Sequence, residues 1–299
     1  MHANLLSTSS ASSGMSPIIN FSKHLIRMNS LDRLCVHTIT TKPWPIETAA
    51  KKFSRAGVKG ISVWREALVD RDPQKIKRVL EEEGLEVVSL VRGGFFANRD
   101  KNKRRDAIDM NKKALEEAAS LGAPLLALVC GADPGQTLED SRKQIYDGIS
   151  ALIPVATDLG VKLGIEPLHP MFADTRSAIN TMKQANDLAE KTGSRQVGVI
   201  VDVYHVWWDP DLEKEIMRCA GLRKLFAFHI CDWKVPTTDF LNDREIMGRG
   251  CIPVPGIRKW METAGFNGYN EVEIFSDHYW QKDQDVFLEE IIEAYREYS

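Results

Sequence analysis

The chain has 299 residues, of which 43% are hydrophobic and 27% charged, and this composition is ordinary for a globular protein. Its formal net charge of −3 gives none of the basic bias that nucleic-acid binding requires. No apolar run in the sequence approaches the ~20 residues of a membrane-spanning helix.

The start of the chain and its cysteines bear on the compartment and the domain boundaries. Five cysteines stand at irregular spacing without a Cys-x-x-Cys pair, which argues against a disulfide framework and against a cysteine zinc site. We therefore expect a reducing compartment and a cytoplasmic protein. The first stretch is small, polar and rich in serine. We predict that residues 1–30 form a disordered extension and that residues 31–299 form the folded domain.

From residue 34 onward one unit recurs along the chain. An amphipathic helix ends in a glycine, such as Gly84 or Gly122, and an apolar strand follows within a few residues. Glycine is favoured just past a helix end because that position often needs a positive φ. The predicted strands cover residues 33–38, 58–64, 86–92, 124–130, 161–166, 197–202, 225–231 and 271–275.

Strict alternation of strands and helices predicts a parallel sheet, and eight such units predict closure into a single-domain (β/α)₈ TIM barrel. An open doubly wound sheet is the alternative. No Gly-x-Gly-x-x-Gly follows the first strand, which disfavours that alternative. Active sites of these barrels lie at the carboxyl ends of the strands, so the residues there are the functional candidates.

The last four predicted strands each end in a carboxylate or an imidazole, namely Glu166, Asp202, His229 and Glu273. One acid at a strand end is more often a cap or an ion-pair partner. Four on successive strands, each within an apolar run where a bare charge is costly, indicate a metal site. Three carboxylates and one imidazole are mainly hard ligands, which suits Mn²⁺ or Mg²⁺, with Co²⁺ and Zn²⁺ as alternatives.

Five short motifs connect the chain to a known family. They are Gly-Ile-Glu166-Pro, Val-Asp202-Val-Tyr-His205, Phe-His229-Ile-Cys-Asp232, Glu-Val-Glu273-Ile and the loop from Asp243-Arg244 through Gly248-Arg-Gly250. Through these motifs residues 33–297 resemble the sugar phosphate isomerase/epimerase superfamily, whose fold is the xylose-isomerase-like barrel. The resemblance implies that Glu166 and Glu273 bind the metal and also move the proton. It further implies that His205 and Arg244 hold substrate oxygens.

The chemistry expected of such a site is proton abstraction next to a carbonyl. A divalent cation bound to a carbonyl and the neighbouring hydroxyl acidifies the α C–H, and an adjacent carboxylate can take that proton. The cation also stabilises the enediolate that results. We therefore predict a divalent-metal-dependent isomerase or epimerase of a sugar or keto-sugar.

One departure from the epimerase pattern supports a second interpretation of the function. The epimerases do not generally have a histidine three residues after the fifth-strand glutamate, yet His169 stands there, and position 172 is Phe rather than a second acid. An imidazole near a cation suits a single catalytic base. This pattern resembles the catalytic subunits of C-glycoside deglycosylases, which cleave 3-keto-glycosides by β-elimination, usually with a small partner subunit. The alternative is therefore such a lyase, or a sugar dehydratase, with His169 catalytic.

Further polar and aromatic residues at predicted strand ends are candidates for substrate binding. Indole rings stack on the apolar faces of sugars, and arginine binds oxygen atoms. With His205 and Arg244, the set comprises Trp64, Arg92, Trp207, Asp232 and His37.

The expected partner is a small carbohydrate, with neither nucleic acid nor membrane, and with a homo-oligomer or a small partner subunit as the protein partner. The endonuclease branch of the superfamily uses several extra histidines, and the chain has only seven in all. A non-catalytic sugar sensor is the remaining alternative, and turnover assays with and without EDTA separate it from an enzyme.

Overall fold

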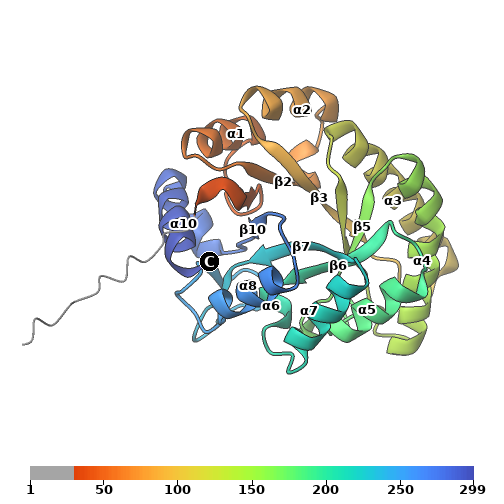
Figure 1. Cartoon of the computed structure of the whole chain (residues 1–299). Coiled ribbons are helices and arrows are strands. Elements are labelled where there is room, and N and C mark those ends of the chain that lie inside the picture. The colour runs from red at the N-terminus through yellow and green to blue at the C-terminus, as the bar shows by residue number, and fades with distance from the viewer. Residues whose placement is uncertain (1–29) are drawn as a thin grey trace, which may run out of the picture.

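The structure is a computed structural model that describes residues 30–299. The predicted disordered extension therefore lies, apart from Ser30, outside the described residues. Eight parallel strands close into a barrel in the order β1-β10-β7-β6-β5-β4-β3-β2 (Figure 1), which confirms the predicted TIM barrel. The strands are β1 (Leu34–His37), β2 (Gly60–Trp64), β3 (Glu86–Gly94), β4 (Leu125–Val129), β5 (Lys162–Glu166), β6 (Val197–Asp202), β7 (Leu225–Ile230) and β10 (Asn270–Val272).

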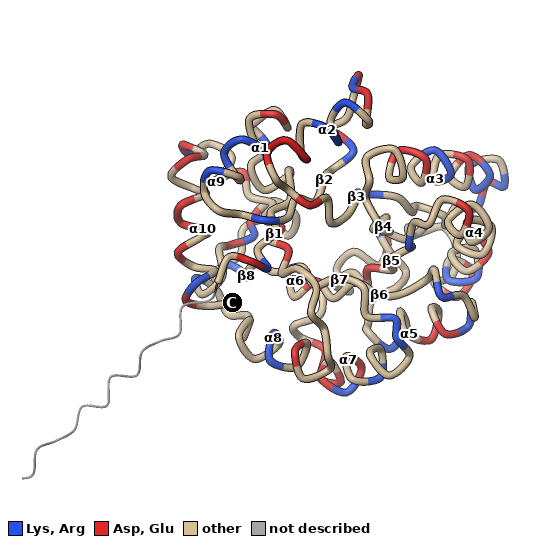
Figure 2. The backbone as a smooth tube through the Cα atoms, turned by 45° about the horizontal axis from the view of Figure 1, so that its top comes forward, with Lys and Arg blue, Asp and Glu red and all other residues tan. Residues whose placement is uncertain are grey.

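Helices surround the barrel, and Figure 2 shows acidic and basic residues mixed along this outer ring. No helix of residues 30–299 combines the length and the apolar character needed to cross a membrane. The helices are α1 (Ile46–Arg55), α2 (Pro73–Glu82), α3 (Lys101–Leu121), α4 (Leu138–Asp158), α5 (Met182–Lys191), α6 (Val203–Val206), α7 (Leu212–Gly221), α8 (Val254–Thr263), α9 (Asp277–Trp280) and α10 (Gln284–Tyr298), with short 3₁₀ turns η1 (Leu31–Arg33), η2 (Arg65–Leu68) and η3 (Pro170–Phe172).

Local sequence signals set the helix ends. Asp72 accepts a hydrogen bond from the backbone N–H of Gln74 at the start of α2, and Pro73 occupies the first helical turn, where its missing N–H costs nothing. Gly122 ends α3 with φ at 83°, a left-handed conformation that favours glycine. These boundaries fix the point at which each following strand enters the barrel.

Alternation along the strands sorts side chains between two regions. In β6, Val199 and Val201 belong to the large core between strands and helices, while Ile200 belongs to a small cluster inside the barrel. Successive side chains of a strand point to opposite faces, so Asp202 shares the inner side with Ile200. The same alternation places His229 with Ala227 on the inner side of β7. The apolar interior of the barrel therefore ends in a layer of polar side chains at its carboxyl rim.

Two short strands that the sequence did not predict stand beyond this rim. β8 (Asp232–Trp233) pairs antiparallel with β9 (Arg244–Glu245). This pairing folds the segment after β7 back over the barrel mouth and so positions Arg244 there.

Candidate active site

The structure brings together the four residues that the sequence predicts as metal ligands. Glu166, Asp202, His229 and Glu273 are all buried, and each offers one ligand atom within 4.8 Å of the others. They come from β5, β6, β7 and the residue after β10, which are adjacent in the ring. The strand register itself pairs Asp202 with His229.

The donor atoms in this cluster fit a divalent cation. Oε1 of Glu166 and Nδ1 of His229 lie 3.0 Å apart, within ion-pair distance but without the geometry of a hydrogen bond, and neither atom has a hydrogen-bond partner elsewhere among the described residues. Buried polar atoms without partners are costly, and both would be satisfied by one cation between them. Three carboxylates and one imidazole are a suitable ligand set for such an ion.

Without a cation the cluster holds protons. Burial raises the pKa of Asp202 to about 6, with the acidic neighbours Glu166 and Glu273 adding to the effect and Arg244 opposing it. Burial alone would lower the pKa of His229, but the surrounding glutamates raise it to about 10. A cation must therefore displace protons to bind, because carboxylates and imidazoles coordinate through deprotonated atoms.

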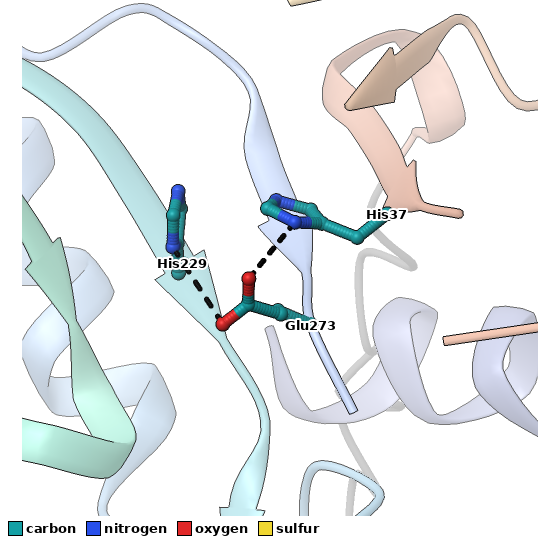
Figure 3. A group of neighbouring side chains, drawn as sticks. All are labelled: His37, His229 and Glu273. Atoms are coloured by element: carbon teal, nitrogen blue, oxygen red, sulfur yellow. Dashed lines mark ion pairs between the residues drawn. The ribbon is translucent and has the colours of Figure 1, made fainter. Parts of the chain in front are cut away.

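His37 from β1 lies against the cluster. Figure 3 shows Glu273 between the rings of His37 and His229, with Nδ1 of His37 3.0 Å from Oε1 of Glu273. Nε2 of His37 lies 3.2 Å from Glu271. Burial lowers the pKa of His37, but both glutamates outweigh burial and raise it. The sequence assigns His37 to substrate binding, whereas in the structure its nitrogens contact two carboxylates, so it orients Glu273.

Glu271 is a site residue that the sequence analysis missed. Its Oε2 accepts hydrogen bonds from the hydroxyls of Ser62, at 2.6 Å, and Ser89, at 3.3 Å. The available signal was its spacing: Glu271 precedes Glu273 by two residues in an apolar strand, and therefore points to the same inner side. These hydrogen bonds hold the carboxylate of Glu271, which in turn contacts Nε2 of His37.

Arg244 and His205 lie at the rim beside the cluster. Nη1 of Arg244 donates to Asp202 and to Glu273, each at 3.0 Å. Nη2 of Arg244 lies 3.1 Å from Nε2 of His205. Burial, and then the positive charge of Arg244, hold the pKa of His205 well below its ordinary value, so this imidazole is neutral. Both side chains therefore present polar atoms next to the candidate metal site.

Asp232 holds the loop that carries Arg244. Its Oδ1 accepts from the backbone N–H groups of Trp233 and Ile252, and its Oδ2 from those of Gly248 and Gly250, all at 2.8–2.9 Å. Both oxygens are thus engaged by protein groups. The sequence places Asp232 in substrate binding, and its observed contacts indicate that it positions the loop.

His169 lies in an aromatic environment rather than on the metal ligands. Its ring centroid is 5.6 Å from Trp208 and 5.2 Å from Trp233, and Nδ1 accepts from the N–H of Met171. Burial lowers the pKa of His169, so it is neutral at pH 7. Its backbone N–H donates a hydrogen bond to Nδ1 of His205 at 3.3 Å. His169 is thus linked to the cluster through His205. Trp207 packs on Trp233 at 5.9 Å in the same aromatic group.

A cavity of about 610 Å³ opens at the barrel mouth. Two predicted substrate-binding residues, Trp64 and Arg92, line it, and Arg176 lines it as well. The sequence analysis missed Arg176, which lies in the loop after η3 where no periodicity marks it. Trp64 links the cavity to the cluster, because its indole nitrogen lies 3.2 Å from Nδ1 of His37.

The family model described as a xylose isomerase-like TIM barrel matches residues 50–297. The chain belongs to that family. Among curated relatives, inosose isomerase from Bacillus velezensis is 27% identical over 191 residues, which are 62% of this chain and 66% of that protein. The chain thus spans slightly less than two thirds of that relative. A probable ketose 3-epimerase from Synechocystis is 25% identical and is matched over 74% of this chain and 76% of its own length.

A third relative is a dehydratase. The 3-dehydroshikimate dehydratase from Pseudomonas aeruginosa is 25% identical over 75% of this chain, although only 35% of that longer protein is matched. Among solved structures, a protein from Sinorhizobium meliloti is 41% identical, with a TM-score of 0.86 over 89% of this chain and 98% of its own. The IolI protein with a bound zinc atom shares the fold at 22% identity and a TM-score of 0.77, over 88% of this chain and 96% of its own.

Proposed function

We propose that this protein is a divalent-metal-dependent isomerase or epimerase that moves a proton next to the carbonyl of a sugar or keto-sugar. The observation that carries the proposal is the buried cluster of Glu166, Asp202, His229 and Glu273 at the barrel mouth. The similarity to inosose isomerase and ketose 3-epimerase supports the same class of reaction.

The four clustered residues would hold the cation, and their oxygen-rich set favours Mn²⁺ or Mg²⁺, with Co²⁺ or Zn²⁺ as alternatives. When bound, such an ion polarises a carbonyl and makes the neighbouring C–H more acidic. The zinc-bound IolI structure supports a metal in a barrel of this fold.

Glu166 and Glu273 are suited to move the proton. They come from β5 and the end of β10, which are separated in the ring by β6 and β7. They therefore approach the substrate from different sides, as an epimerase needs when one base removes a proton and another returns it. Burial disfavours the charged form of Glu273, but His37 and Arg244 hold its pKa well below the ordinary range. Glu273 is thus ionised, which is the form that can accept a proton.

Arg244 and His205 complete this account. The guanidinium of Arg244 and the neutral ring of His205 stand next to both Asp202 and Glu273, where the oxygens of a bound sugar would lie. Donors aimed at an oxygen that gains charge stabilise it most when they are fixed in advance. Asp232 helps to fix Arg244 by holding its loop.

A second candidate is a lyase that eliminates from a 3-keto-glycoside, or a sugar dehydratase. The specific observation in its favour is His169, a neutral and half-buried imidazole next to His205. The dehydratase relative supports this class as well. We place it second because the bases Glu166 and Glu273 are in the cluster itself, whereas His169 is outside it.

Turnover in D₂O tests the proposal. Metal-loaded protein is incubated with a panel of ketoses, inososes and 3-keto-glycosides, and proton NMR follows the hydrogen next to the carbonyl. We expect exchange of that hydrogen with formation of an epimer or isomer. We also expect the activity to be lost with EDTA, restored by Mn²⁺ and abolished in Glu273→Gln. Turnover with full retention of that hydrogen would contradict the proposal.

A further inference from the structure

The cavity at the barrel mouth is positively charged, although the protein as a whole is negative. Its lining contains four cationic residues and one acidic residue, Glu66, whereas the formal net charge of the chain is −3. The cationic residues are Lys42, Arg71, Arg92 and Arg176. A cleft with one sign of charge concentrates ligands of the opposite sign.

Three of these cations lack a carboxylate partner within residues 30–299: Lys42, which is exposed and lies over the ring of Trp280, and the two arginines Arg92 and Arg176. Arg71 pairs with Glu47, but neither Arg92 nor Arg176 forms an ion pair or donates a side-chain hydrogen bond within residues 30–299. Both are only partly exposed. Arginines in such positions are usually paired, because partly burying an unpaired charge is costly.

Aromatic rings hold both guanidinium groups in place. Arg92 lies over the ring of Trp64 at 5.6 Å and over that of Phe95 at 4.9 Å. Arg176 lies over the ring of Phe172 at 5.7 Å. A guanidinium stacked by its face keeps its N–H groups, which lie in the plane of the group, free to donate. Burial, and next the charge of Arg92, lower the pKa of Arg176, so the two cations are near enough to repel each other.

The cavity lies next to the candidate metal cluster. Trp64 lines the cavity and contacts His37, which in turn contacts Glu273. Phe275, two residues after Glu273, also lines it. A molecule with a carbonyl at the cluster would extend its far end toward the two arginines.

We propose that Arg92 and Arg176 bind a carboxylate at the end of the substrate remote from the reacting carbonyl, so that the preferred substrate is a keto-sugar acid. This inference rests on the proposed function, because it takes the cluster as the place of the carbonyl. A pair of arginine forks matches the planar geometry of a carboxylate. Phosphate sites, by contrast, commonly use glycine-rich backbone, and the cavity lining contains no glycine.

A matched pair of ligands tests the inference by binding alone. L-sorbose and 5-keto-D-gluconate differ only in a terminal CH₂OH or carboxylate, and D-fructose 6-phosphate serves as the phosphate arm. Calorimetry on metal-loaded protein measures the affinity of each. We expect 5-keto-D-gluconate to bind at least about tenfold more tightly than L-sorbose, and more tightly than the phosphate ester. Salt should weaken this preference.

Variants assign the preference to the two arginines. Arg92→Gln and Arg176→Gln should each reduce 5-keto-D-gluconate affinity about tenfold or more while changing L-sorbose affinity less than about threefold. Arg99→Gln, which removes an exposed cation outside the cavity lining, should change neither. Equal affinities of the two sugars, no binding of either, stronger binding of the phosphate ester, or an unchanged preference in both cavity variants would overturn the inference.

The result also separates this inference from the proposed function. Preference for the acid without hydrogen exchange in D₂O would contradict the proposed reaction but support the anion site. Hydrogen exchange on neutral ketoses without preference for the acid would support the proposed reaction but contradict the anion site.

Discussion

Arg244 and Glu273 are joined by a buried hydrogen bond of 3.0 Å between Nη1 and Oε2. The other oxygen of Glu273, Oε1, faces His37 at 3.0 Å. The carboxylate is therefore held between a guanidinium and an imidazole, which keep it ionised and fix its orientation at the barrel mouth. The bond thus links Arg244, a proposed substrate-binding residue, to Glu273, a proposed proton acceptor.

Replacing Arg244 tests that relationship. We expect Arg244→Gln to keep its bound metal but to lose about 10²–10³-fold in kcat, the usual cost of removing one oriented donor. Arg249→Gln is the matched control, since it removes an arginine from the same loop that pairs with Glu290 on the outside. Similar losses in both variants would mean that the loop as a whole, and not Arg244, is responsible.

His169→Ala distinguishes the two candidate reactions. In an epimerase that uses Glu166 and Glu273, His169 is peripheral, and we expect a loss of less than about tenfold, or about 1.4 kcal/mol. A general base typically contributes about 10²–10⁴-fold. A loss above about 10²-fold on a 3-keto-glycoside, with unchanged metal content, would place elimination first.

Metal affinity should rise with pH. The glutamates around His229 outweigh its burial and raise its pKa to about 10, so the metal-free ring carries a proton that the cation must displace. Affinity should increase about tenfold per pH unit between pH 6 and 9. Below about pH 6 Asp202 also takes up a proton, so the dependence should become steeper. Competition with a chromogenic chelator measures this profile, and a flat profile from pH 6 to 9 would contradict the ligand assignment.

Asp232→Ala should destabilise the protein. Removing the carboxylate leaves four backbone N–H groups of the loop without their acceptor, and we expect a loss of about 3 kcal/mol or more in the free energy of unfolding. Asp239→Ala removes an acceptor of two N–H groups in an exposed turn and should cost about 1 kcal/mol or less. Urea titration compares the two, and equal costs would mean that Asp232 does not anchor the loop.

Most strands were predictable because they are largely buried on both faces and read as apolar runs shortly after a glycine. The four clustered residues stood out because each interrupts such a run at its end. The β8–β9 pair was not predictable, since two-residue strands carry no periodicity. Arg176 was missed for a related reason: its position depends on how a loop folds over the barrel, which no local pattern encodes.

The predicted roles of individual side chains depended on contacts that the sequence does not contain. His37 and Asp232 stand at strand ends, as expected, but their polar atoms are engaged by Glu271, Glu273 and backbone N–H groups. The predicted barrel already implied that the four metal-ligand candidates lie close together at one rim. The hydrogen-bond partner of each side-chain nitrogen and oxygen could be identified only from the structure.

Anomalous diffraction from a crystal grown with Mn²⁺ tests the central claim most directly. The account predicts one strong peak per chain within about 2.0–2.3 Å of ligand atoms from Glu166, Asp202, His229 and Glu273. The peak should be absent in Asp202→Ala crystals treated in the same way. A peak at other residues, or no peak in protein that retains its activity, would contradict the account.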